Sequence, residues 1–122
     1  MINFTHRNIG IFYSSLAERD RIFDYISKQL DVEYLRMEKS IYSIRIIFPN
    51  IIIHFLPITD SARGYIFDEA YVTEFTIQNK NILIAELAVA HTNGTLYVMK
   101  EWYDGSFSRV NYYDYEKKEK EL

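Results

Sequence analysis

The spacing of apolar residues in the first quarter of the chain predicts a strand followed by a helix. Residues 9–13 form a short apolar run, which is typical of a buried strand. Ser15 and Glu18 are spaced as a capping box, in which the serine hydroxyl bonds the glutamate amide and the glutamate carboxylate reaches back. Apolar residues then recur at helical spacing as far as Leu30, with charged residues between them. We therefore expect a βα unit whose helix ends near Leu30.

Two isoleucine-rich runs follow and predict a hairpin. Residues 41–48 and 51–56 are separated by the Pro-Asn pair at 49–50, which favours an antiparallel turn. The second run is almost continuously apolar, so we expect it to be buried on both faces of the sheet. After a polar loop at 59–64, the region 65–75 carries one further strand and three acidic residues.

A second helix is predicted at 82–91, and it is apolar around most of its circumference. Asn79 or Asn81 can cap its first turn. Because so few of its positions are polar, we expect this helix to be mostly buried. Asn93-Gly94 then supplies a left-handed stop, and residues 95–99 begin another strand.

The last part of the chain predicts a hairpin rich in aromatic residues. Asp104-Gly105 is a hairpin turn signal, and tryptophan, tyrosine and phenylalanine residues flank it on both sides. Residues 116–122 are highly charged with both signs, and they either extend a helix or fray. We therefore expect one α/β domain at 1–115, a mixed β-sheet with two main helices and a C-terminal aromatic hairpin, followed by a charged tail at 116–122.

Composition narrows the classes of function. A chain of 122 residues is long enough to fold around one core without metal or disulfide support. The absence of cysteine excludes a disulfide framework and a thiolate zinc site. A net charge of −3 argues against electrostatic binding of nucleic acid by the whole domain. The first residues show no signal-peptide pattern and no apolar run is long enough for a membrane span, so we expect a small cytoplasmic protein.

The acidic residues Asp68, Glu69 and Glu74 are the candidate catalytic residues. A nucleotide-hydrolysing sheet presents one carboxylate to hydrated Mg²⁺ and a second to the attacking water, at the C-terminal end of an apolar strand. Neighbouring residues of a strand point to opposite faces, however, so an adjacent pair lines one site only where the strand bends. The structural alternative is that these carboxylates are solvated at a strand edge.

The other residues that could bind an anion or a metal ion are weaker candidates. Arg63 and Gly64 can hold an anion through the guanidinium and backbone amides, or they can form a plain loop. The histidines at positions 6, 54 and 91 have no partner at ligand spacing, so we expect no metal site. We expect no cofactor, apart from Mg²⁺ if the acidic strand is active.

Aromatic and acidic residues near the C-terminus are the candidate partner-binding residues. Tyrosine and tryptophan offer a large contact area at low entropic cost, and the accompanying acids suit a protein better than a phosphate backbone. The alternative is a hairpin that is packed within the domain. The candidates are Trp102, Tyr103, Asp104, Tyr112, Tyr113, Asp114 and Tyr115. We expect a protein partner, indirect or weak contact with nucleic acid, and leave a homo-oligomer open.

The order of predicted elements resembles a known family. Strand, helix, hairpin, Arg-Gly loop, acidic strand, helix, glycine and strand follow one another across residues 9–99. This order is similar to the ATPase core of viral terminase large subunits and related helicase-like P-loop enzymes, in the half that carries the Walker B acids. The family's spacing after the Arg-Gly pair implies that the acidic strand is 70–74, with Thr73 at the metal-binding aspartate position; the other register makes Asp68-Glu69 the acidic pair.

Enzymes of this family carry a phosphate-binding loop that this sequence lacks. No Gly-x-x-x-x-Gly-Lys-Ser/Thr segment occurs among the 122 residues, so the loop that cradles phosphates is missing. The resemblance therefore implies a degenerate ATPase-like domain, and we expect a non-enzymatic phage or mobile-element protein that is an accessory or regulator of a nucleic-acid motor. One alternative is an acidic, tyrosine-rich inhibitor that occupies the basic groove of a host nucleic-acid-binding or defence protein. A second alternative is a Mg²⁺-dependent nucleotidase or nuclease built on the three acidic residues.

Overall fold

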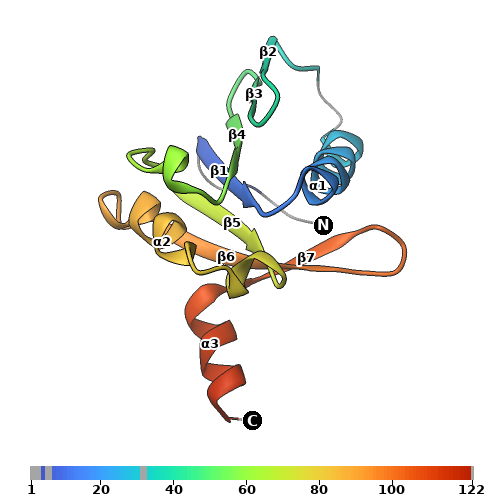
Figure 1. The fold of residues 1–122 in the computed structure, drawn as a ribbon. Helices are drawn as coiled ribbons and strands as arrows, with labels where there is room; N and C mark the ends of the chain where they lie inside the picture. Colours follow the sequence, from blue (N-terminus) through green and yellow to red (C-terminus); the bar gives the residue numbers. More distant parts are fainter. Residues whose placement is uncertain (1–3, 5–6, 31–32, 122) are drawn as a thin grey trace.

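A seven-stranded mixed sheet with helices on both faces forms the body of the protein (Figure 1). The computed structural model describes residues 4, 7–30 and 33–121. The strands are β1 (Asn8–Tyr13), β2 (Arg36–Lys39), β3 (Ile44–Ile47), β4 (Ile52–Pro57), β5 (Glu69–Thr73), β6 (Thr95–Glu101) and β7 (Phe107–Asn111). The helices are α1 (Leu16–Gln29), α2 (Ile82–Ala90) and α3 (Tyr112–Glu121), with two short 3₁₀ helices, η1 (Asp60–Ala62) and η2 (Thr76–Gln78).

The sheet has a parallel centre and antiparallel flanks. Its strand order is β2-β3-β4-β1-β5-β6-β7. Strands β4, β1, β5 and β6 run parallel, whereas β2, β3 and β7 pair antiparallel with their neighbours. The carboxyl ends of the four parallel strands therefore meet at one edge, which we call the carboxyl edge.

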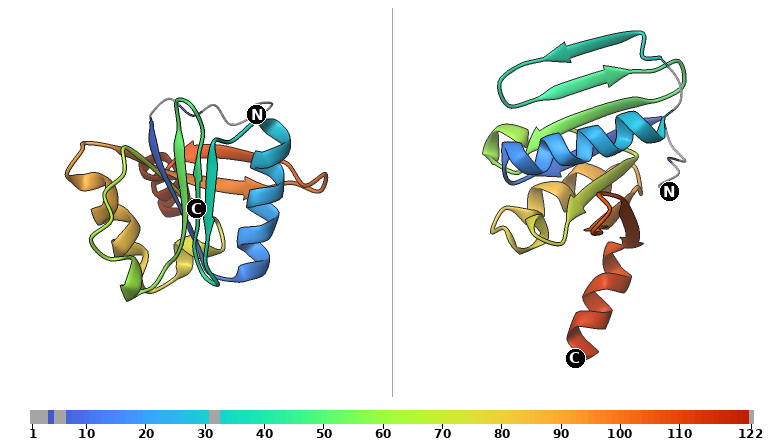
Figure 2. Two further views of the ribbon diagram at one scale, coloured as in Figure 1. Left: turned by 90° about the horizontal axis from the view of Figure 1, so that it is seen from above. Right: turned by 90° about the vertical axis from the view of Figure 1, so that its right-hand side faces the viewer.

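Two apolar cores lie on opposite faces of this sheet. In the view from above, α1 stands on one side of the central strands and α2 on the other (Figure 2). Ile22 and Ile26 of α1 pack with Ile9 and Ile11 of β1. Ile9 and Ile11 share one face of the sheet because alternate residues of a strand point to the same side. Phe12, which faces the other way, joins the second core with α2.

Most of the predicted elements are confirmed. The single α/β domain, the βα unit and the hairpin of β3 with β4 are present, and β6 and β7 form the C-terminal hairpin with Gly105 in the left-handed region (φ 83°). Asn93, rather than the glycine after it, has the positive φ of 52° at the end of α2. No helix in the described part of the chain is long and apolar enough to cross a membrane.

Three expectations need correction or addition. The tyrosines at 112, 113 and 115 belong to helix α3 and not to the aromatic hairpin, and this helix continues into the charged residues from 116, one of the two expectations for them. Strand β2 was not predicted, because an exposed edge strand reading Arg-Met-Glu-Lys carries no apolar alternation. Helix α2 buries only its inner face, since Leu83 and Leu87 are 52% and 46% exposed.

Candidate functional site at the carboxyl edge

The carboxyl edge is where open α/β sheets bind their ligands, because loops diverge there and leave a crevice. In this protein β1 ends at Tyr13 and the chain turns through Ser14 and Ser15 into α1. Strand β5 ends beside it at Thr73 and leads into η2, which begins at Thr76. The site is therefore built from the β1–α1 turn and from the chain that follows β5.

A buried carboxylate occupies the centre of this edge. Glu18 is 3% exposed, and its Oε1 accepts hydrogen bonds from the Ser14 amide at 3.1 Å and the Thr76 hydroxyl at 2.5 Å. Its Oε2 accepts a hydrogen bond from the Thr73 hydroxyl at 2.9 Å. The Glu18 amide in turn donates to Ser15 Oγ at 3.2 Å, as the capping box predicts, but the carboxylate reaches back to Ser14 and not to the capping serine.

Further hydrogen bonds connect the groups around this carboxylate. The hydroxyls of Ser14 and Thr76 lie 2.7 Å apart, and the Thr76 amide donates to Thr73 Oγ1 at 3.0 Å. Each hydroxyl thus has a partner within the protein, and the network joins α1 to the end of β5. This arrangement can hold the two elements together. It also keeps the Glu18 carboxylate out of contact with solvent.

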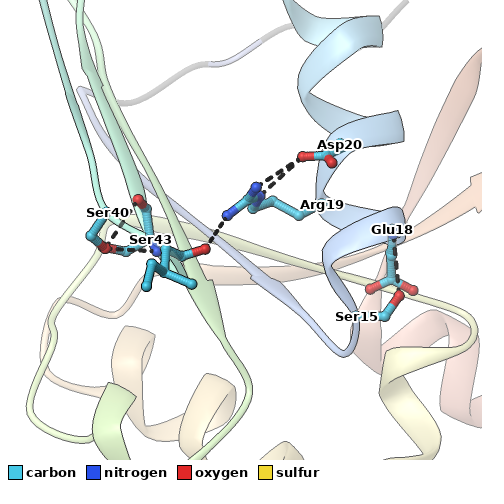
Figure 3. A network of polar contacts seen from close by, with 7 residues as sticks. Ser15, Glu18, Arg19, Asp20, Ser40 and Ser43 are labelled. Atoms are coloured by element: carbon cyan, nitrogen blue, oxygen red, sulfur yellow. Dashed lines mark hydrogen bonds and ion pairs between the residues drawn. The ribbon is translucent and has the colours of Figure 1, made fainter.

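The same helix is also held to the turn between β2 and β3. The Arg19 side chain, which is buried, donates from Nη1 to the Ile41 carbonyl at 3.0 Å and pairs with Asp20 at 3.1 Å (Figure 3). The turn that it reaches is closed by Ser40 and Ser43, whose hydroxyls lie 2.9 Å apart. Consecutive residues of α1 therefore fix both its neighbours, Glu18 toward β5 and Arg19 toward the β2–β3 turn.

The acidic candidates do not converge. Asp68 precedes β5, Glu69 begins it and Glu74 follows its last residue. The expectation that Asp68-Glu69 ends an apolar strand is therefore wrong, and β5 covers residues 70–73 of the other expected acidic strand, 70–74. Glu69 and Glu74 are five residue steps apart, which is about 17 Å at the rise of an extended chain. Among the described residues, no group of three histidine, aspartate or glutamate side chains could hold a metal ion.

Glu69 belongs to a separate buried cluster. It is wholly buried, and its Oε2 lies 3.2 Å from Nη1 of Arg109 on β7. The Tyr71 hydroxyl donates to Glu69 and accepts from Arg109, while the Arg109 guanidinium lies 4.3 Å from the ring centroid of Tyr97. Burial, together with the neighbouring Glu69 carboxylate, raises the pKa of Tyr71 well above its ordinary value. The cluster ties β5 to β7 beneath α1.

The Arg-Gly loop lies on the opposite face, beside α2. Arg63 forms an ion pair with Asp60 at 2.9 Å, and Gly64 has a φ of 92°. Together with Tyr65 and His91, they line a pocket of about 230 Å³. Anion binding by Arg63 stays a prediction. A bound anion would compete with the Asp60 carboxylate for the Arg63 guanidinium.

The aromatic candidates form two groups, one at each end of β7. Trp102, Tyr103 and Asp104 lie at the tip of the β6–β7 hairpin, where Tyr103 is fully exposed. The Trp102 indole donates to Ser108 at 2.9 Å, and the Lys100 ammonium lies 4.6 Å from the centroid of the indole ring. These contacts give the tip a defined aromatic surface.

The second aromatic group lies in the first turn of α3. Tyr112 is 9% exposed and belongs to the core that also contains α2, whereas Tyr113 is 79% exposed. The Tyr115 hydroxyl lies 3.4 Å from Glu74, and Asp114 is exposed. The five residues of β7 stand between the two groups, so the seven candidates do not make one surface.

Two features of the structure were not identified from the sequence. Glu18 was assigned only to a helix cap, because its partners Thr73 and Thr76 lie 55 and 58 residues away. The exposed leucines of α2 form one wall of a groove of about 700 Å³ whose other wall is α3. The sequence did contain a signal for this groove. A helix that is apolar all round has more apolar residues than one buried face can cover, so some of them are left exposed.

Comparison with known proteins identifies the fold. No protein-family model and no curated protein matches the chain. The large terminase of a thermophilic bacteriophage has a similar structure, with a TM-score of 0.51 and 13% identity over 79% of this chain and 26% of that one. The same terminase in complex with ADP gives a TM-score of 0.52 and 13% identity over 80% of this chain and 26% of that one.

The chain spans about a quarter of the length of these terminase structures. At this identity the likeness concerns the fold and not the chemistry. The protein therefore has a terminase-like α/β fold, with a buried hydrogen-bond network at the edge of the sheet where such folds bind ligands.

Proposed function

We propose that this chain is a non-enzymatic phage or mobile-element protein that acts as an accessory or regulator of a nucleic-acid motor. The observation that carries the proposal is the buried Glu18 network at the carboxyl edge. Both carboxylate oxygens of Glu18 already accept hydrogen bonds from Ser14, Thr73 and Thr76. A nucleotide or hydrated Mg²⁺ that used this carboxylate would have to displace these bonds.

The residue at the end of β5 supports the same conclusion. In the family register Thr73 stands at the position of the metal-binding aspartate, and Mg²⁺ is held in such sites by carboxylate oxygens. The Thr73 hydroxyl donates to Glu18 and accepts from the Thr76 amide. The 122 residues also contain no phosphate-binding loop with its lysine. We infer a degenerate ATPase-like domain that docks where a complete motor subunit would pack.

Two measurements test this proposal. The melting temperature should be the same with and without ATP, ADP and Mg²⁺, because we expect no nucleotide binding. A nucleotide that did bind would, at a hundredfold its dissociation constant, stabilise the fold by about 2.7 kcal/mol and raise the melting temperature. Addition of the chain to a purified phage large terminase should change the terminase's ATPase rate. A Mg²⁺-dependent melting shift, with ATP hydrolysis that Asp68→Ala or Glu74→Ala abolishes, would instead establish the nucleotidase alternative.

The exposed hairpin tip favours a second candidate function. Tyr103 is fully exposed beside the exposed Asp104, which suits insertion into a basic groove of a host nucleic-acid-binding or defence protein. Affinity for such a target should fall steeply between low and high salt, since exposed charge pairs are screened. Asp104→Asn should reduce that salt dependence, and affinity that is insensitive to both salt and Asp104→Asn would exclude the inhibitor.

A further inference from the structure

The outer face of α2 is apolar and uncovered. Its inner face packs on the sheet through residues such as Ile84 and Ala88, as an amphipathic helix requires. On the outer face Leu83 and Leu87 are 52% and 46% exposed, and Ala90 continues the same stripe at the next turn. Positions four and then three residues apart align along a helix, so this stripe is about 10 Å long.

A groove runs beside this stripe, between α2 and α3. Both helices pack against β6, and the groove that they enclose has a volume of about 700 Å³. Leu83, Leu87 and Ala90 line it from α2, while Tyr112 and Tyr113 line it from α3. Tyr113 is 79% exposed, and an exposed tyrosine at the rim of an apolar groove is the kind of residue that anchors a protein partner.

Two carboxylates give the groove a negative charge. Glu86 and Glu116 line its two walls, and no lysine or arginine is among the described residues that line it. The Tyr112 hydroxyl donates to Glu116 Oε1 at 2.6 Å. Burial and the carboxylates of Glu116 and Glu86 raise the pKa of Tyr112. Both carboxylates therefore act on the Tyr112 hydroxyl within the groove.

We propose that this groove binds an amphipathic helix of a protein partner, with an apolar stripe flanked by lysine or arginine. The apolar stripe of such a helix would cover Leu83 and Leu87, while its basic residues would face Glu86 and Glu116. A second copy of this chain fits less well, because its own groove would bring like charges together. That the helix belongs to a nucleic-acid motor rests on the proposed function.

The test uses the full chain and two designed peptides. Each is a labelled helical peptide of about 14 residues, close to two turns longer than the stripe, with leucines at matching spacing. One carries lysines beside the leucines and the other carries glutamates. Fluorescence anisotropy should show that the lysine peptide binds at least about tenfold more tightly than the glutamate peptide.

Variants of the groove locate the binding site. Leu87→Gln should weaken binding of the lysine peptide about tenfold, and the double variant Glu86→Gln, Glu116→Gln should weaken it by about fivefold and reduce its salt dependence. Phe75→Gln is the matched control, because Phe75 is 71% exposed but does not line the groove. Circular dichroism melts check that each variant folds, and Leu83→Gln replaces Leu87→Gln if that variant does not.

Several results would overturn the inference. They are equal affinity for the two peptides, no binding of either peptide at about 1 mM, or binding that the leucine variants leave unchanged. The outcome is separable from that of the proposed function. If Leu87→Gln and Leu83→Gln regulate a terminase as the parent chain does, the groove is not the docking site and the motor function stands. If the lysine peptide binds but no terminase responds, the groove stands and the motor function fails.

Discussion

Replacing Glu18 with alanine tests whether the buried network at the carboxyl edge holds the fold together. The substitution removes the acceptor of three hydrogen bonds, from the Ser14 amide and from the hydroxyls of Thr73 and Thr76. A hydrogen bond to a charged group contributes about 1.5–3 kcal/mol to stability. The sum of three such bonds is an upper limit, because some of the donors can find other partners.

The structure shows which donors can do so. The Ser14 and Thr76 hydroxyls are already 2.7 Å apart, and Thr73 Oγ1 already accepts from the Thr76 amide, so the hydroxyls can pair among themselves. The Ser14 amide, which cannot rotate toward these hydroxyls, loses its protein acceptor. Loss of the buried carboxylate also removes its desolvation cost. We therefore expect Glu18→Ala to lower the free energy of unfolding by about 3 kcal/mol, and Glu18→Gln, which keeps one acceptor oxygen, to lower it by about 1 kcal/mol.

Urea unfolding followed by circular dichroism measures both values. Glu101→Ala is the control, because Glu101 forms an exposed ion pair with Arg21 at 2.9 Å and such pairs contribute at most about 1 kcal/mol. Equal m-values for the variants would show that the change lies in stability and not in the unfolded state. A loss for Glu18→Ala that matches the loss for Glu101→Ala would refute the assignment of a structural role to the network.

Three further predictions concern other buried groups. Arg109→Met leaves the buried Glu69 carboxylate without its guanidinium and should cost about 3–5 kcal/mol in urea unfolding; a loss under about 1 kcal/mol would contradict this. Burial, and then the charge of Arg45, lower the pKa of His54 below its ordinary value of 6.5, so the unfolded chain binds the proton more readily. Stability should be insensitive to His54 above pH 6.5 and fall as the pH drops from there toward the folded-state pKa, and His54→Gln should flatten that part of a plot of unfolding free energy against pH. Gly10→Ala places a Cβ atom 2.3 Å from the Phe67 ring and should cost about 1–3 kcal/mol, so an unchanged melting temperature would count against this close packing.

The local elements were predictable because their signals span only a few residues. The Ser15 and Glu18 spacing identified the start of α1, and the Pro-Asn pair at 49–50 identified the turn between β3 and β4. Helix α2 was predicted with nearly its observed bounds. Side-chain caps and turn dihedrals depend on neighbouring residues, so a single sequence contains what they need.

The candidate site was much less predictable. Two apolar segments flank Asp68-Glu69, at 65–67 and 70–72, and an acidic residue follows within two residues of each, so the sequence allows either segment to be the strand that leads to the carboxylates. Pairing with β1 and β6 decides the matter, since Glu69 aligns with Ile9 and with Thr95 and so begins the strand. The aromatic residues were treated as one group for a similar reason, since the sequence does not show that β7 separates Trp102 from Tyr113.

The sequence by itself determined the α/β class, the order of its principal elements and the caps and turns between them, because these follow from spacing and from short-range hydrogen bonds. Only the tertiary structure decided that Glu18 closes the carboxyl edge with Thr73 and Thr76, and that Leu83 and Leu87 are left uncovered on α2. Both facts depend on contacts between segments that are distant in the chain. Strand register and burial are set by those contacts, and no local pattern of residues specifies them.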